Sequence, residues 1–439
     1  MSQNFEDFTA ALAKGSGRSV LIMRQAANPR SFEDAVVHAC LHDLAYDPQC
    51  EHERSEYLAR LIVETGDETG LFGRLVAQIK DQEVDAPLLF TVLARLAAKN
   101  GDFEKSAVQR AYLDLDPEAQ LDCLDALVRL VGMPAFIEGA ARIDADLEGE
   151  GWRAGGLLDA LKDHDEATFD QSVGAARAEH PSVERLMAQY EASNQPTRVA
   201  DGSYDLPAIL AELRQGKRLR GVIFKDLSSD DWQLICEDFL AQDREEVALP
   251  YLTLFGRRPF TGNPVELVRW TKSSNSRVVW AATRALGRME SAVVREMALE
   301  QIRAGRPSGA RLLASNYRSG DLAMILPMLR DLPDNDEVHD LGLAILNLTG
   351  ENDVSAEDSA DVLLLLYERT PCSMCRADVV SRLFKAQRVP DWMADECRFD
   401  SDPEAVERPD GVDAGSYGRR GHHHAHRDCR PVAAGGLTR

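Results

Sequence analysis

Apolar side chains recur along this chain with the spacing of short amphipathic helices. Residues 85–101 place Leu88, Leu89, Val92 and Leu93 on one stripe, and residues 276–289 and 291–305 repeat the pattern on either side of a short polar turn. No stretch sustains the period of two that is typical of strands. The pattern predicts an all-α protein with essentially no β-sheet.

The predicted helices are too short to bury their apolar faces alone, so they must stack on one another. Five more apolar helical segments follow residue 305, at intervals of about 15–20 residues. The sequence therefore predicts an α-solenoid of stacked antiparallel helical pairs. Such proteins usually act through their surfaces.

Two changes in composition divide the chain. Residues 193–203 mix Pro, Gly, Asn and Ser, and the acidic excess of the preceding residues ends there. We expect an acidic N-terminal helical region, residues 1–195, and a more regular repeat region, residues 204–404. Residues 405–439 contain one Leu, no Ile and no Phe, which predicts a disordered tail or a non-native extension.

Bulk composition narrows the classes of function. The chain has 439 residues, a formal net charge of −23 and only 6% aromatic residues. The acidity disfavours nucleic-acid binding by the whole surface. The N-terminus does not resemble a signal peptide, and the longest aliphatic run, Val362 to Leu366, is too short to span a membrane. Eight cysteines are too few for a disulfide scaffold, so we expect a cytoplasmic protein with reduced thiols.

The region from about 204 to 404 resembles bacterial proteins with HEAT-type repeats. The resemblance lies in RVVWAATRALGRMESAVVREMAL (residues 277–299), with YLTLFGRRPF (251–260), NYRSGD (316–321) and YERTPCSMCR (367–376) around it. It implies a right-handed stack of helical pairs that offers a binding surface, and it implies no particular activity.

The strongest chemical candidate is Cys372-Ser-Met-Cys375, with Cys397 and His339. Cys372 follows a proline where a helix should begin, and a helix N-terminus lowers the pKa of a thiol. Three cysteines and one histidine would also complete a tetrahedral structural zinc site. A single Cys-x-x-Cys motif is weak evidence, however, and burial as small core residues is the favoured interpretation. Structural metal and redox or disulfide chemistry remain the alternatives.

Two further groups are weaker candidates. Asn316, Tyr317 and Asp321 could line a polar surface site beside His339, although such residues are also common in turns. Five basic residues could form a stripe that contacts phosphates, but neighbouring acidic residues favour ordinary solvated helix faces. These residues are Lys217, Arg218, Arg220, Arg257 and Arg258.

No catalytic sequence motif stands out, which favours a non-enzyme. A histidine run, residues 422–426, could chelate metal adventitiously in the tail. We expect a scaffold that mediates protein–protein interaction. The alternatives are a nucleic-acid-associated protein of the repair type, or a metal or redox module in the last helical pair.

Overall fold

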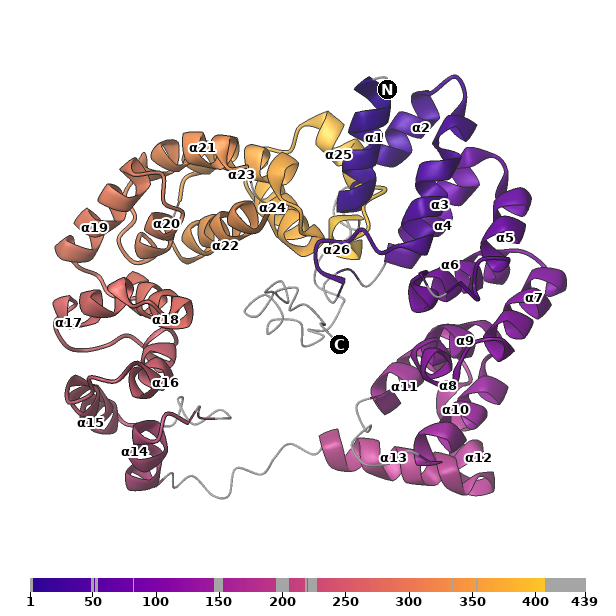
Figure 1. Ribbon diagram of the computed structural model, residues 1–439, viewed down its shortest axis with the longest axis horizontal. Coiled ribbons are helices and arrows are strands. Elements are labelled where there is room, and N and C mark those ends of the chain that lie inside the picture. Colours follow the sequence, from indigo (N-terminus) through magenta and orange to yellow (C-terminus); the bar gives the residue numbers. More distant parts are fainter. Residues whose placement is uncertain are drawn as a thin grey trace. The chain divides into compact units, whose positions relative to one another are not determined.

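The computed structural model of the chain is built from helices (Figure 1), and the residues that it describes contain no strand. The all-α prediction is therefore confirmed for this part of the chain. The described residues are 3–48, 51, 54–81, 83–145, 153–194, 205–217, 219, 227–333, 335–352 and 354–406. Among them, no helix is long and apolar enough to cross a membrane. The predicted tail, apart from its first two residues, lies outside this range.

The chain forms two compact units. Unit 1 comprises residues 1–198 and 391–439, and unit 2 comprises residues 199–390. The chain returns to unit 1 at Asp391, which lies within the predicted repeat region of residues 204–404.

Unit 1 contains the following helices. They are α1 (Gln3–Lys14), α2 (Arg18–Gln25), η1 (Pro29–Phe32), α3 (Glu33–Leu41), α4 (Arg54–Thr65), α5 (Glu68–Val76), α6 (Ala86–Lys99), α7 (Asp102–Leu113), α8 (Pro117–Asp122), α9 (Leu124–Val131), α10 (Met133–Ala145), α11 (Arg153–His164), α12 (Phe169–Glu179), α13 (Pro181–Asn194), α25 (Asp391–Cys397) and α26 (Pro403–Val406).

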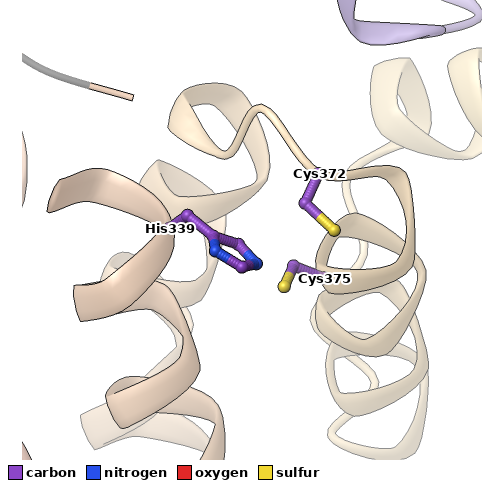
Figure 2. Close-up of side chains that lie close together, drawn as sticks. All are labelled: His339, Cys372 and Cys375. Carbon is purple, nitrogen blue, oxygen red and sulfur yellow. The ribbon is translucent and has the colours of Figure 1, made fainter. Parts of the chain in front are cut away.

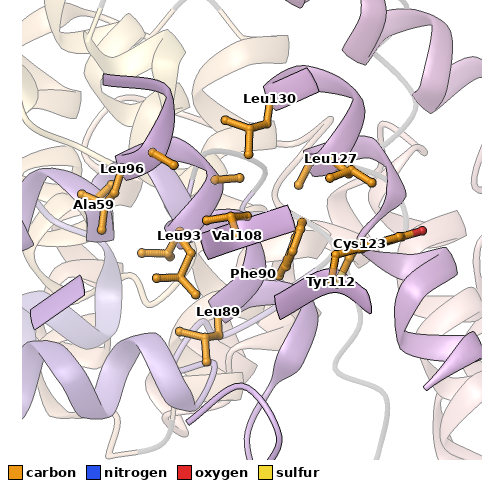
Figure 3. Packing of buried hydrophobic residues seen from close by; sticks show 14 of the residues in the cluster. Ala59, Leu89, Phe90, Leu93, Leu96, Val108, Tyr112, Cys123, Leu127 and Leu130 are labelled. Atoms are coloured by element: carbon orange, nitrogen blue, oxygen red, sulfur yellow. The ribbon is translucent and has the colours of Figure 1, made fainter. Parts of the chain in front are cut away.

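The core of unit 1 is aliphatic and continuous from helix to helix. Helix α6 packs against α4, α7 and α9, and its residues Leu89, Leu93 and Leu96 are completely buried. Figure 3 shows these side chains on one side of Val108 of α7, with Leu127 of α9 on the other side. Helix α6 also contacts α3, α5 and α8, so these short amphipathic helices bury their apolar faces against several neighbours.

The C-terminal helices belong to unit 1 because they pack on its first helices. The guanidinium of Arg18 donates to Glu396 at 2.6 Å, and the backbone N–H of Ser401 donates to the Gly15 carbonyl at 2.9 Å. A Cβ atom at Gly17 would lie 1.9 Å from the carbonyl oxygen of Glu396. Only glycine at position 17 allows this approach.

Unit 2 contains the remaining helices. They are α14 (Leu206–Arg214), α15 (Ser229–Leu240), α16 (Glu245–Phe255), α17 (Val265–Val268), η4 (Arg269–Lys272), α18 (Ser276–Gly287), α19 (Ala292–Arg303), α20 (Ser308–Leu312), α21 (Asp321–Asp331), α22 (Asn335–Glu351), α23 (Ala356–Arg369) and α24 (Ser373–Lys385).

The helices of unit 2 pack in order along the chain. Each even-numbered helix from α14 to α22 contacts the next even-numbered helix, which forms one row. A second row is formed by α19, α21 and α23, because α21 contacts both of the others. Contacts between α19 and α20 and between α23 and α24 join these two rows. Helix α18 approaches α20 closely at Gly287, where a Cβ atom would lie 2.3 Å from the carbonyl oxygen of Arg311.

Candidate metal or thiol site

The structure brings His339, Cys372 and Cys375 together between helices α22 and α24 of unit 2. His339 lies near the start of α22, Cys372 is the N-cap residue of α24, and Cys375 lies in the first turn of α24. Figure 2 shows the imidazole facing both sulfur atoms. Because residues three apart share one side of a helix, the Cys-x-x-Cys spacing directs both thiols toward α22.

The local backbone holds Cys372 in place. The backbone N–H of Cys372 donates to Oγ1 of Thr370 at 3.4 Å, and its carbonyl accepts from the backbone N–H of Arg376 at 3.1 Å. Pro371 stands between Thr370 and Cys372, which favours extended backbone before the helix. Cys372 therefore enters α24 with its sulfur beside the first N–H groups of the helix.

The three side chains are close to one another and almost completely buried. A potential ligand atom from each residue lies within 4.8 Å of those of the other two. His339 and Cys372 are each 2% exposed, and Cys375 is 1% exposed. A nitrogen and two sulfur atoms thus converge at a point that bulk water hardly reaches.

The surroundings lower the pKa of the Cys372 thiol to about 4. A hydrogen bond from Cys375 contributes most, and burial acts in the opposite direction. A hydrogen bond from His339, the backbone N–H of Cys375 and the charge of His339 lower the pKa further. These contacts favour the thiolate form of Cys372.

Other buried cysteines lie in a different environment. Burial raises the pKa of Cys40 and of Cys123 to about 12, and it also raises the pKa of Cys236. These thiols behave as small hydrophobic core residues. The interpretation favoured from the sequence is that Cys372, Cys375 and Cys397 are small buried core residues, and all three are buried. The lowered pKa of Cys372 nevertheless distinguishes it from these other buried thiols.

Cys397, the third cysteine of the predicted site, is not part of this group. It ends α25 in unit 1, where it is completely buried, whereas the group of three belongs to unit 2. The predicted set of four ligands is thus reduced to His339, Cys372 and Cys375.

The three residues of the predicted polar surface site make contacts that hold neighbouring helices together. Asn316 and Asp321 are buried, at 9% and 4% exposed, so they do not form an exposed site. Asn316 bonds the backbone at three points, and Asp321 forms an ion pair with Arg295 at 2.6 Å. Tyr317 reaches Asp358 at 3.4 Å. These contacts join α19, α20, α21 and α23.

The predicted basic stripe is described only in part, because Arg218 and Arg220 lie outside the described residues. The histidine run 422–426 also lies outside them. Arg258 donates to the Leu227 carbonyl at 2.9 Å and lies 5.0 Å from the centre of the Trp232 ring. Arg258 therefore packs within unit 2. Lys217 and Arg257 are exposed, and nothing on the described surface marks them as a phosphate site.

An open hollow between α11, α12 and α13 in unit 1 has a volume of about 390 Å³. Its charged lining includes Asp159, Lys162, Asp170 and Arg177. Arg177 is already paired with Glu184 and Glu191, at 2.7 and 2.6 Å. The hollow therefore carries mixed, locally neutralised charge and does not define a ligand.

Fold and site together define an all-α protein with a buried group of two cysteines and one histidine. No protein-family model, curated protein or solved structure matches the chain.

Proposed function

We propose that the protein is an α-solenoid of HEAT-like antiparallel helical pairs and acts as a scaffold for a protein partner. One observation carries the proposal: in unit 2, each even-numbered helix packs on the next even-numbered helix. Contacts of this kind between successive repeats are typical of solenoids, which present extended surfaces to partners. The proposal includes a bacterial, cytoplasmic setting, which the free thiols of the described cysteines support.

The chemistry of the surface favours a partner with a basic face. The net charge of −23 would steer such a partner toward the scaffold. Helix α7 of unit 1 also exposes two large apolar side chains, Phe103 at 74% and Leu113 at 67%. Asp102 and Glu104 flank Phe103 in the sequence, and Asp114 follows Leu113. Apolar anchors next to acidic residues suit a partner that has pockets bordered by lysines or arginines.

The test uses the full chain as immobilised bait in an extract of its own source cells. We expect one protein to be retained in near-equimolar amount, and its retention to fall as salt is raised. Phe103→Ser combined with Leu113→Ser should lose the partner. Val265→Ser, which changes an apolar residue of unit 2 that is 53% exposed, is the matched control and should keep it.

Two results would contradict the proposal. The absence of any stoichiometric protein, from a bait whose helical content is intact, would reject a protein scaffold. Tight binding of DNA or RNA that weakens steeply with salt would instead support the alternative, a nucleic-acid-associated protein. If the unchanged chain, the Phe103→Ser/Leu113→Ser variant and the Val265→Ser variant capture the partner equally, α7 is not the contact site.

A further inference from the structure

We propose that His339, Cys372 and Cys375 form a binding site for Zn²⁺ between α22 and α24. Thiolate sulfur and imidazole nitrogen are the ligands that zinc prefers in proteins. The inference does not depend on the proposed scaffold function, because it concerns the interior of unit 2 alone.

The geometry of the group fits a tetrahedral ion. With zinc bonds of about 2.0–2.3 Å, two ligands of a tetrahedral site lie roughly 3.5–3.8 Å apart. The three ligand atoms already lie within 4.8 Å of one another. Small side-chain rotations would therefore bring them to bonding distance, without movement of either helix.

Burial and charge also favour a metal over a purely apolar function. Burying an imidazole next to two thiols is unfavourable unless their polar atoms have partners, and one metal ion would bind all three residues at once. Two thiolates and one neutral imidazole around Zn²⁺ give a complex with no net charge. A neutral complex can be buried at low cost, and the three residues are buried to 98% or more.

The proposed ion would connect parts of the chain that are distant in sequence. His339 comes from the start of α22, whereas both cysteines come from the start of α24. Zinc would fasten these two helices together, and its binding free energy would add to the stability of the last helical pair. The described residues of the group supply three ligands, so the fourth position would hold water or another small ligand.

The experiment uses the full chain with the tail histidines 422, 423, 424 and 426 changed to alanine, because these could bind metal themselves. The protein is purified under reducing conditions, loaded with Zn²⁺ and freed of excess metal, and its zinc is then measured by mass spectrometry. We expect one equivalent in this parent protein. Cys372→Ser, Cys375→Ser and His339→Ala should each lose most of it.

Cys123→Ser and Cys236→Ser are the matched controls, because these cysteines are buried outside the group. They should retain one equivalent. Loading with Co²⁺ gives a second readout, because a thiolate ligand produces a sulfur-to-cobalt charge-transfer band. That band should be strong in the parent protein and in both controls. Adding Zn²⁺ should raise the melting temperature of the parent protein. It should not raise that of Cys375→Ser, and if this variant has the same helical content as the parent, the difference reflects lost zinc binding and not lost folding.

Three results would overturn the proposal. The first is a folded parent protein that retains far less than one equivalent of zinc. The second is equal zinc content in the parent and in the three site variants, which would place the ion elsewhere. The third is a disulfide between Cys372 and Cys375 that persists in the reducing preparation, which would make the pair a redox couple.

Discussion

Buried polar residues determine much of the local structure of unit 2. The side-chain amide of Asn316 donates to the carbonyls of Met289 and Leu312, at 2.9 and 3.2 Å, and accepts from the backbone N–H of Ser291 at 2.8 Å. One side chain thereby satisfies the backbone at the end of α18, in α20 and at the start of α19. Buried backbone groups without such partners are strongly unfavourable.

Replacing Asn316 should therefore destabilise unit 2. We expect Asn316→Ala to lower its free energy of unfolding by about 2–3 kcal/mol, because buried donors and acceptors lose their partner. Arg318→Ala, an exposed change in the same turn, is the control and should have an effect below about 0.5 kcal/mol. Urea unfolding monitored by hydrogen exchange of α19 and α20 measures the change in free energy of unfolding for both variants. Equal stability of the two variants would contradict the role given to Asn316.

Local spacing explains how far the candidate site could be predicted. Cys372 and Cys375 meet because three-residue spacing on a helix dictates it, so the sequence alone was sufficient. Their contact with His339 depends on the packing of α22 against α24, which local patterns do not specify. Cys397 lies on α25, which belongs to unit 1 because the chain from Asp391 packs there, and the sequence pattern gave no sign of this return.

The helices themselves follow from caps and apolar stripes. The segment predicted over 85–101 forms α6, Ala86–Lys99, and Asp85 caps it by accepting from the backbone N–H of Leu88 at 3.0 Å. The segment predicted over 291–305 forms α19, with Ser291 as its cap. Local chemistry is sufficient for such elements, whereas the order in which they pack is a property of the folded chain.

The caps make a prediction at the scale of one element. Asp85→Ala should destabilise unit 1 by about 1 kcal/mol, because it removes the hydrogen bond to the first turn of α6. Asp205 occupies the same position before α14 but makes no capping hydrogen bond, so Asp205→Ala is a matched control. Its effect on unit 2 should be clearly smaller. Amide hydrogen exchange in the first turns of α6 and α14 measures the two effects. An equal loss of protection in both helices would contradict the capping role of Asp85.

Close backbone approach governs the attachment of α25 to the first helices of unit 1. We expect Gly17→Ala to release residues 391–406 from α1 and α2, because the added Cβ atom would collide with the carbonyl of Glu396. Gly73→Ala, at a helical position with no atom within 4 Å, should leave α25 protected. Limited proteolysis after residue 385 detects the difference. An α25 that stays equally resistant in both variants would refute this view of the contact.

At the scale of the whole molecule, the proposed solenoid implies that stability spreads only from neighbour to neighbour. In a stack of helical pairs each repeat touches the adjacent ones, so local damage should stay local. In a protein with one central core, a local destabilising substitution would lower stability throughout the molecule. The return of the C-terminal residues to unit 1 could not be foreseen from the repeat pattern, because it joins segments almost 380 residues apart through contacts such as Arg18 with Glu396.

Hydrogen exchange of Gly287→Ala tests this central claim most directly. The added Cβ atom would press on the Arg311 carbonyl and should cost about 1–3 kcal/mol at the contact of α18 with α20. Gly174→Ala, in the open on α12 of unit 1, is the control and should be neutral or slightly stabilising. The account predicts that Gly287→Ala loses protection in α18 and α20, less in α16 and α22, and none in unit 1. Uniform loss of protection across both units would contradict it.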